Sequence, residues 1–220
     1  MSDVSKVHSS VVTWSGGLDT TALLAFLMKE RHARVFPIFV NRNQENLTEE
    51  KRSVQYYTAQ FKRMFTDLFS YPFEVSVPIP ANEFRSKYPK KADKFYALRN
   101  SDITNSAARY AFILDVPLVT VGALFDDEMF PDISPEYWRI KNTEVALATE
   151  KQVAIEAPFQ RMRMKKADVV YWCNKHSIAI EKTWTCWRPG PKQCGSCDAC
   201  LSRKRAFKSA KVKDLTEYLN

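Results

Sequence analysis

The sequence predicts an α/β fold in which a parallel sheet is covered by helices on both faces. Short apolar runs alternate along the chain with longer segments whose apolar residues recur at helical spacing, which is the pattern of successive strand and helix units. The 220 residues, 45% of them hydrophobic, suffice for one substantial core. We therefore predict a single domain over residues 1–220.

The expected elements follow one another regularly. In the first helix, Ala22, Leu23, Phe26 and Leu27 share one face. Residues 80–95 are polar and lysine-rich, and we expect a loop or lid there. The expected strands cover residues 9–13, 33–40, 73–77, 117–122 and 153–155, and the expected helices cover residues 19–30, 47–69, 100–114, 135–151 and 167–176.

Composition excludes a membrane-embedded protein. The longest apolar runs, residues 35–40 and 116–121, are far shorter than a membrane span, and the N-terminus lacks the apolar core of a signal peptide. We expect a cytoplasmic protein that contacts no membrane. The formal net charge of +8 favours an acidic partner, which the charge does not identify: nucleotide phosphates, nucleic acid and an acidic protein all qualify.

A glycine-bearing turn follows the first strand. Ser15, Gly16 and Gly17 offer a small hydroxyl and two backbones without side chains, so successive N–H groups can close around phosphate oxygens at the start of a helix. Asp19 could cap that helix or face a magnesium ion. An ordinary strand-to-helix turn uses the same residue types. The lysine of the Walker pattern is missing.

This turn resembles the SGGxD[ST] pyrophosphate loop of the adenine-nucleotide α-hydrolase superfamily, whose members cleave ATP between the α and β phosphates. The resemblance rests on Ser15-Gly16-Gly17-Leu18-Asp19-Thr20. It implies that the protein activates a carboxylate or similar oxygen by adenylation. The residues that it places around ATP are Trp14, Ser15, Gly16, Gly17, Leu18, Asp19, Thr20, Thr21, Ala22, Leu23 and Leu24.

Four of the five cysteines lie close together near the C-terminus. Cys186, Cys194, Cys197 and Cys200 include two overlapping C-x-x-C steps, and four thiolates at this spacing can reach one tetrahedral zinc ion. An iron–sulfur cluster is the main alternative. Because protein ligands would fill all four positions, we expect structural zinc in segment 183–207. Cys173 stands alone and is expected to be a buried small hydrophobe.

The loop and the C-terminal segment together resemble the QueC family of 7-cyano-7-deazaguanine synthases. The second motif runs from Thr185-Cys186 to Cys194-Gly195-Ser196-Cys197-Asp198-Ala199-Cys200 and ends at Ala206-Phe207. The resemblance implies five parallel strands, bound zinc and a homodimer. It also implies that ATP and Mg²⁺ adenylate 7-carboxy-7-deazaguanine, that ammonia displaces AMP to give an amide, and that further ATP converts the amide to a nitrile.

Several inner motifs match that family only in part. Arg99-Asn100 resembles a Gly-Arg-Asn motif, but Leu98 stands in place of the glycine, so we expect a reshaped loop. Phe130-Pro131-Asp132 resembles Tyr-Pro-Asp, whereas the following Ile133 and Ser134 replace cysteine and arginine. Gly122, Asp127 and Lys166-Ala167-Asp168 resemble other family positions. The residues expected to act in catalysis are Ser15, Asp19, Arg99 and Asp127.

Two alternatives to the synthase remain at this point. A QueC-like ligase could join a deazaguanine carboxylate to a protein amine in a defence system. The altered motifs and the excess of basic residues motivate this alternative. A tRNA-modifying or nucleic-acid-binding protein could grip phosphates with the cysteine segment and Arg203-Lys204-Arg205. Because no RNA-binding domain is added to the chain, we do not expect nucleic acid as a partner.

Overall fold

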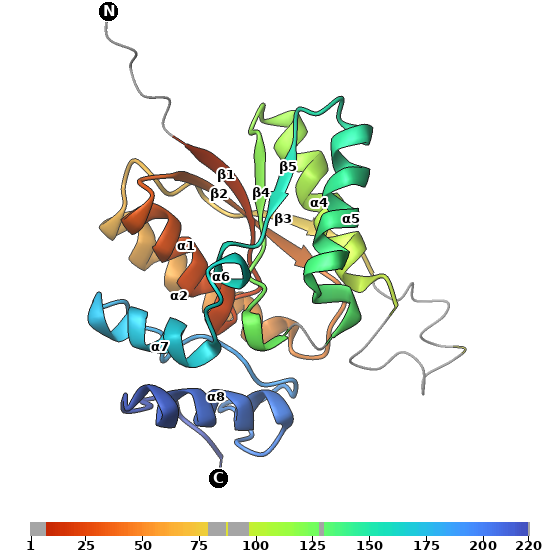
Figure 1. The fold of residues 1–220 in the computed structure, drawn as a ribbon. Helices are drawn as coiled ribbons and strands as arrows, with labels where there is room; N and C mark the ends of the chain where they lie inside the picture. Colours follow the sequence, from red (N-terminus) through yellow and green to blue (C-terminus); the bar gives the residue numbers. More distant parts are fainter. Residues whose placement is uncertain (1–7, 79–86, 88–96, 128–129, 220) are drawn as a thin grey trace, which may run out of the picture.

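The computed structural model describes residues 8–78, 87, 97–127 and 130–219. Its centre is one sheet of five strands in the order β3-β2-β1-β4-β5, with every neighbouring pair parallel (Figure 1). The parallel five-stranded sheet is therefore confirmed. The strands are β1 (Ser9–Thr13), β2 (Arg34–Asn41), β3 (Phe73–Ser76), β4 (Leu118–Thr120) and β5 (Ala154–Glu156).

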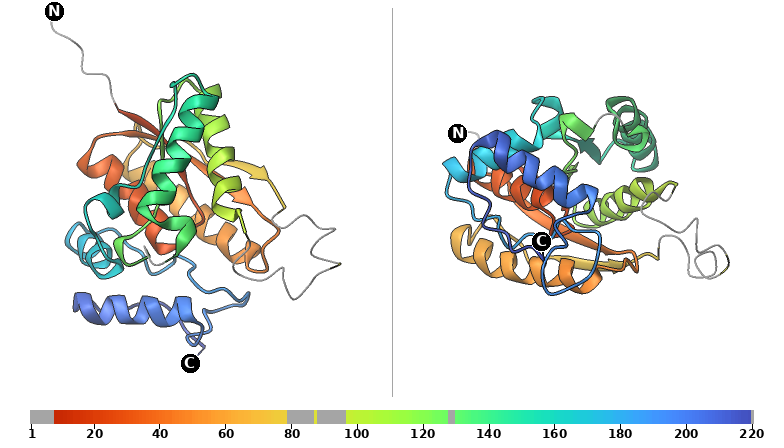
Figure 2. Two further views of the ribbon diagram at one scale, coloured as in Figure 1. Left: turned by 45° about the vertical axis from the view of Figure 1, so that its right-hand side comes forward. Right: turned by 90° about the horizontal axis from the view of Figure 1, so that it is seen from below.

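Helices cover both faces of this sheet, as Figures 1 and 2 show. Successive residues of a strand point to opposite faces, so Val12 packs in the core beneath α1 and α2, whereas Val11 packs in the core beneath α4 and α5. The helices are α1 (Leu18–Glu30), α2 (Leu47–Met64), α4 (Arg99–Ile113), α5 (Pro135–Ala148), α6 (Pro158–Arg161), α7 (Lys166–Lys175) and α8 (Asp198–Ala210), with short 3-10 turns η2 (Phe125–Asp127) and η3 (Pro131–Ile133).

The order of the strands reverses direction at β1. The chain proceeds from β1 to β2 and β3 on one side, then returns to place β4 and β5 on the other side. In such sheets a crevice opens beyond the carboxyl ends of the strands at the reversal point. Here the register pairs Val12 of β1 with Thr120 of β4, which brings the loops after these two strands together.

Some element boundaries differ from expectation. The second helix ends at Met64 instead of continuing to Phe69, because Phe69 forms a bridge with Val35 of β2. The helix α8 was not expected. The loop or lid expected at residues 80–95 lies outside the described residues, apart from Lys87. None of the helices in the described part of the chain has the length and apolar character that a membrane span requires.

Leu98 has a left-handed backbone, so the expectation that a non-glycine residue would avoid positive φ at this position is wrong, while the reshaped loop stays a prediction. Its φ is 66° and its ψ is 7°, directly before α4, and its side chain is 70% exposed. A side chain in this conformation brings Cβ close to a carbonyl oxygen, which costs about 1–2 kcal/mol. Because Leu98 is largely exposed, burial of its side chain offsets little of that cost.

We predict that Leu98→Gly raises the free energy of unfolding by up to about 1 kcal/mol, because glycine adopts this φ without the steric cost. The greater chain entropy of glycine in the unfolded state offsets part of the gain. Urea denaturation measures the change. Leu98→Ala is the matched control, since it removes the same exposed side chain but keeps Cβ. A Leu98→Gly protein no more stable than Leu98→Ala would contradict the prediction.

Candidate active site and metal centre

The turn between β1 and α1 is built around two glycines. Gly16 has a φ of 74°, and a Cβ there would lie 2.7 Å from the carbonyl oxygen of Glu50 in α2. Gly17 is the N-cap residue of α1 and no side chain caps the helix. The first turn of α1 therefore leaves backbone N–H groups to an anion, and the helix dipole favours negative charge there.

The hydroxyl side chains of the turn face one another. Ser15 Oγ accepts a hydrogen bond from the Gly17 N–H at 3.3 Å and lies 3.3 Å from Thr20 Oγ1. A Cβ on Gly122, just after β4, would lie 2.8 Å from Thr20 Cγ2. Glycine at position 122 thus permits the close approach of β4 to the loop.

Several residues that we expected around ATP have buried side chains. Trp14 is 1% exposed, and its Nε1–H donates to Thr21 Oγ1 at 3.0 Å. These buried residues support the turn from the protein interior, and its partly exposed side chains are those of Ser15, Asp19 and Thr20. The buried members of the expected set are Trp14, Leu18, Thr21, Ala22, Leu23 and Leu24.

Asp19 faces a lysine from the far end of the chain. Its Oδ2 lies 2.9 Å from Nζ of Lys166, the first residue of α7. Its Oδ1 is buried and has no hydrogen-bond partner among the described residues. Because Gly17 is the N-cap, the interpretation of Asp19 as the capping residue is wrong. Sequence reasoning assigned no role to Lys166, which is separated from Asp19 by 147 positions.

Asp127 lies beside this ion pair. Burial, followed by the nearby charge of Asp19, raises its pKa to about 6. Although burial alone would lower the pKa of Lys166, Asp19 and Asp127 together raise it. The Lys166 backbone N–H also points at the Asp126 carboxylate, at 3.3 Å. Elements α1, η2 and α7 thus bring the carboxylates of Asp19 and Asp127 and the ammonium group of Lys166 to the carboxyl edge of the sheet, a set that suits a divalent cation and phosphate oxygens. The side chain of Asp126 is exposed and lies on the rim of this group.

Two of the partly matching motifs meet in space. Asn100 Nδ2 donates to Asp132 Oδ2 at 2.7 Å and to the Asp132 carbonyl at 3.2 Å, which ties the start of α4 to η3. The charge of Arg99 acts on buried Glu50 of α2, whose pKa burial raises. The positive charge of Arg99, at the start of α4, therefore reaches the carboxylate of Glu50.

The departures at positions 133 and 134 have local structural roles. The side chain of Ile133 is partly buried and packs against the core cluster that contains residues of α4 and α5. Ser134 is the N-cap of α5, and its Oγ accepts from the Tyr137 N–H at 3.2 Å. A serine is among the preferred N-cap residues, so this substitution supports α5.

The four C-terminal cysteines form one buried cluster that could hold zinc. All four sulfur atoms lie within 4.8 Å of one another, and the pairs Cys186–Cys197 and Cys194–Cys200 are each 3.9 Å apart. Tetrahedral bonds of about 2.3 Å to a single zinc ion place sulfurs about 3.8 Å apart. In a four-iron cluster each thiolate binds a different iron, which spreads the sulfurs more widely. The geometry therefore favours one ion.

Backbone groups support this cluster. The Cys194 N–H donates to Cys186 Sγ at 3.4 Å, and the Cys197 N–H donates to Cys194 Sγ at 3.3 Å. Such bonds stabilise negative charge on the thiolates. Cys173 is fully buried in a different cluster, in the main core, as expected for a small hydrophobe.

Arg203 is not available to bind phosphate. It is completely buried, and its guanidinium donates to Thr183 Oγ1, Thr185 Oγ1 and the Ile180 carbonyl at 2.7, 3.0 and 2.8 Å. Lys204 Nζ donates to the Gly195 carbonyl at 3.0 Å. The hypothesis that residues 203–205 form a phosphate-binding run is therefore wrong for its first member, whose hydrogen bonds all lie inside the protein.

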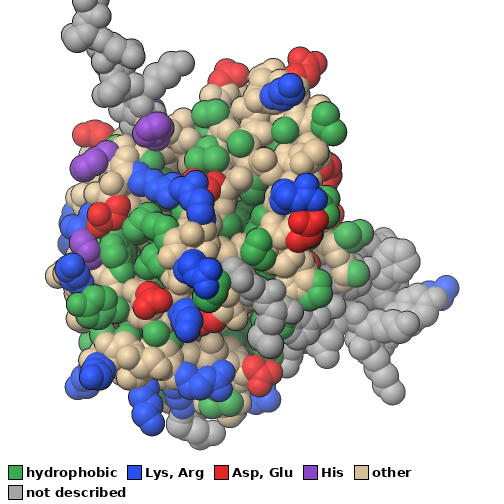
Figure 3. Space-filling model, viewed as in Figure 1, with side chains coloured by type: hydrophobic (Ala, Val, Ile, Leu, Met, Phe, Trp, Pro, Cys, Tyr) green, Lys and Arg blue, Asp and Glu red, His purple; other side chains and the backbone are tan. Residues whose placement is uncertain are grey.

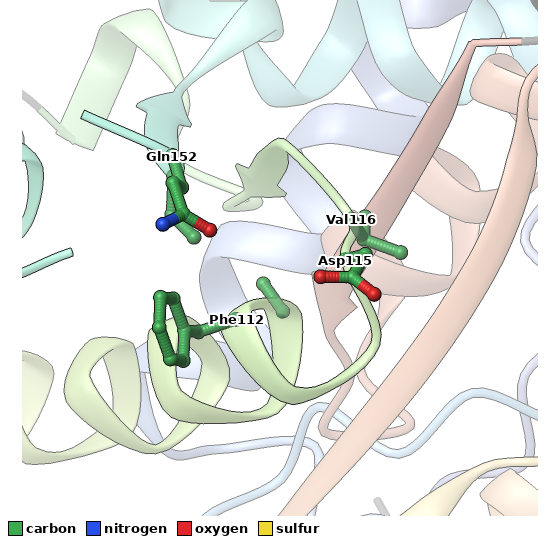
Figure 4. Close-up of a pocket in the computed structure, with 6 residues that line it drawn as sticks. Phe112, Asp115, Val116 and Gln152 are labelled. Atoms are coloured by element: carbon green, nitrogen blue, oxygen red, sulfur yellow. The ribbon is translucent and has the colours of Figure 1, made fainter. Parts of the chain in front are cut away.

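Two cavities lie at the opposite edge of the sheet, before the strands begin. One, of about 90 Å³, is lined by Phe112, Asp115, Val116 and Gln152 among others (Figure 4). The other, of about 420 Å³, is lined by residues that include Ser9 at the start of β1 and Leu118 at the start of β4. Neither reaches the glycine turn, so neither is the candidate site.

A parallel five-stranded sheet with a glycine turn at the strand reversal, and with acidic and lysine side chains beyond it, has the architecture of a PP-loop fold. The solved structure of "U34-tRNA thiolase NcsA from Methanococcus maripaludis with its [4Fe-4S] cluster" has this fold. It matches with a TM-score of 0.54 at 15% identity, covering 96% of this chain and 70% of that one.

The family model "Queuosine biosynthesis protein QueC" matches residues 9–211. A 7-cyano-7-deazaguanine synthase of Thermoplasma acidophilum is 30% identical, covering 95% of this chain and 91% of the relative. Another protein of that name, from Acetivibrio thermocellus, is 27% identical and covers 97% and 99%. The chain belongs to the QueC family.

We predict about one zinc ion per chain, because four thiolates with this geometry form a closed tetrahedral site. Cys200→Ser should lose the metal and unfold the C-terminal segment, since binding energy of such sites contributes to folding, while Cys173→Ala should keep the metal. Elemental analysis and circular dichroism provide the measurements. Iron with visible charge-transfer absorption, or a stably folded protein without metal, would contradict the assignment.

We predict that Asp127→Asn stabilises the free protein at pH 7.5 but not at pH 3.5. In the folded protein the pKa of Asp127 is raised from 3.8 to about 6. The folded state therefore loses stability relative to the unfolded state as pH rises through that window, because it must hold the ionised carboxylate. After allowance for partial exposure, the gain should be roughly 1–2 kcal/mol in urea denaturation without Mg²⁺. Exposed Asp126→Asn is the control. Equal stability of Asp127→Asn and wild type at pH 7.5 would contradict the claim that the ionised carboxylate of Asp127 destabilises the folded protein.

Proposed function

We propose that the protein converts 7-carboxy-7-deazaguanine, ATP and ammonia into 7-cyano-7-deazaguanine through an acyl-adenylate. The observation that carries this proposal is the uncapped glycine turn at the strand reversal, with Asp19, Lys166 and Asp127 beside it. Membership of the QueC family supports the choice of substrate, as do the names of curated relatives.

The proposed reaction balances over two rounds of activation. A carboxylate oxygen attacks the α-phosphorus of ATP and pyrophosphate leaves. Ammonia then adds to the acyl carbon, and AMP departs with one of the original carboxylate oxygens. In the second round the amide oxygen attacks the α-phosphorus of a second ATP and pyrophosphate leaves again. The nitrogen then loses both protons, and the second AMP carries away the remaining oxygen as the nitrile forms.

The loop and its neighbours can perform the activation step. Backbone N–H groups at the start of α1 would hold the departing pyrophosphate, whose growing charge they stabilise without reorganising. Asp19 and Asp127 would hold Mg²⁺, which supplies Lewis-acid polarisation of the phosphate oxygens. Lys166 would then be released from Asp19 to a phosphate oxygen, and Ser15 would donate from the loop.

Arg99, at the start of α4, completes the proposed set. It would meet the substrate carboxylate, since a guanidinium is well suited to carboxylate recognition. The homodimer expected from the family resemblance remains part of the proposal.

The ligase with a protein acceptor remains a second candidate because of one observation. Residues 161–220 contain 14 Lys and Arg but only 5 Asp and Glu, so the excess positive charge of the chain lies there. Figure 3 shows such side chains gathered over its lower part, where α7 and α8 lie, and Arg205, Lys208 and Lys211 are exposed. A face of this kind could steer an acidic protein to the neighbouring loop.

We predict that the purified protein forms the nitrile from carboxy-deazaguanine, ATP, Mg²⁺ and ammonium, with release of AMP and pyrophosphate, as followed by mass spectrometry. Asp19→Asn should lower the rate by roughly a hundredfold or more, because it removes a preorganised charge. Asp126→Asn, on the exposed part of the same acidic cluster, should retain most activity.

Release of ADP in place of AMP would refute the proposed bond cleavage. AMP formation without nitrile, accompanied by salt-sensitive labelling of an acidic protein, would favour the ligase, because steering by surface charge weakens as salt increases. Nitrile formation that is independent of salt would exclude the need for a protein acceptor.

A further inference from the structure

The cysteine segment meets the nucleotide loop at one peptide. The Trp184 N–H donates to the Gly16 carbonyl oxygen at 3.0 Å, and Ser53 Oγ of α2 donates to the same oxygen at 2.6 Å. The Trp184 carbonyl oxygen also lies 3.7 Å from the position that a Cβ on Gly17 would occupy. The conformation of the two glycines is therefore supported by a residue that precedes Cys186 by two positions.

Arg203 holds the residues on either side of Trp184. Its Nη1 donates to the hydroxyls of Thr183 and Thr185, and its Nη2 donates to the Ile180 carbonyl. The guanidinium is fully buried, while Gln193 Nε2 adds a hydrogen bond to the Thr183 carbonyl at 2.9 Å. Because both neighbours are fixed, the peptide that presents the Trp184 N–H to Gly16 is fixed as well.

The metal ligands place Arg203. Cys197 is the N-cap residue of α8 and Cys200 lies in its first turn, so an ion that binds both sulfurs sets the position of the helix that carries Arg203. A parallel connection comes from α2, where Asn46 Nδ2 donates to the Cys186 carbonyl at 2.9 Å and Glu49 Oε1 accepts from the Gly190 N–H at 3.0 Å.

We propose that Arg203 is a positioning residue that couples the four-cysteine metal site to the pyrophosphate loop. The metal segment then has a role beyond local folding, because its occupancy sets the affinity of the loop for the phosphates of ATP. The choice of ATP as ligand rests on the proposed function. Since coupling between two sites is reciprocal, bound ATP should also strengthen retention of the metal.

The test compares Arg203→Lys with Lys204→Met. Lysine at position 203 keeps the charge but cannot donate in the guanidinium geometry to Thr183, Thr185 and Ile180 together. Lys204→Met removes the hydrogen bond from the adjacent residue to the Gly195 carbonyl and leaves the contacts of the Trp184 peptide unchanged. Both variants keep the four cysteines, so elemental analysis should find wild-type zinc. Hydrogen exchange of residues 14–20 and of Trp184 is measured without nucleotide, and ATP affinity is measured by calorimetry.

We expect Arg203→Lys to speed exchange at these amides and to weaken ATP binding, each roughly tenfold, as loss of one fixed hydrogen bond implies. Lys204→Met should resemble wild type in both measurements. A folded Arg203→Lys protein with wild-type exchange and affinity would overturn the proposal. Should Arg203→Lys fail to fold, Thr185→Val, which removes a hydroxyl that accepts a hydrogen bond from Arg203, tests the same connection with the same two measurements and the same deciding result.

This design separates the coupling from the proposed function. If wild type binds no ATP, the proposed function fails, but the exchange rates of the loop still decide whether Arg203 positions it. If wild type binds ATP and both variants match it in exchange and affinity, the coupling alone fails.

Discussion

The carbonyl oxygen of Gly16 is the point on which the candidate site depends. It accepts hydrogen bonds from Ser53 of α2 and from the backbone of Trp184, while the absence of a Cβ on Gly16 lets the α2 backbone approach. Parts of the chain almost 170 positions apart thereby fix one turn. The N–H groups at the start of α1 are held in place because the opposite side of the loop is bonded to the protein, so the loop is preorganised for the proposed phosphate ligand.

Charge at the carboxyl edge of the sheet is only partly balanced in the free protein. Lys166 neutralises Asp19 at 2.9 Å, and burial together with the Asp19 charge holds the pKa of Asp127 above its usual range. A divalent cation entering between the carboxylates would free the ammonium group for phosphate. The free protein therefore already holds the carboxylates and the ammonium group that the proposed reaction uses, and Lys166 occupies the place beside Asp19 that the cation would take.

Much of this structure could be predicted from the sequence because the signals are local. Apolar runs between amphipathic segments identified the strands, and cysteine spacing identified the cluster. The role of Lys166 could not be read in this way, since its partner lies 147 positions away. A run of three basic residues is typical of a solvated helix face, and only the tertiary contacts with Thr183 and Thr185 show that Arg203 is buried. The left-handed backbone of Leu98 likewise contradicts local preference.

The central claim is that this loop transfers AMP to the substrate carboxylate, and the fate of the carboxylate oxygens tests it most directly. With both oxygens of 7-carboxy-7-deazaguanine replaced by ¹⁸O, mass spectrometry of the nucleotide products follows each atom. The account predicts one ¹⁸O in each AMP released and none in pyrophosphate. Unlabelled AMP, or label in inorganic phosphate accompanied by ADP, would contradict it.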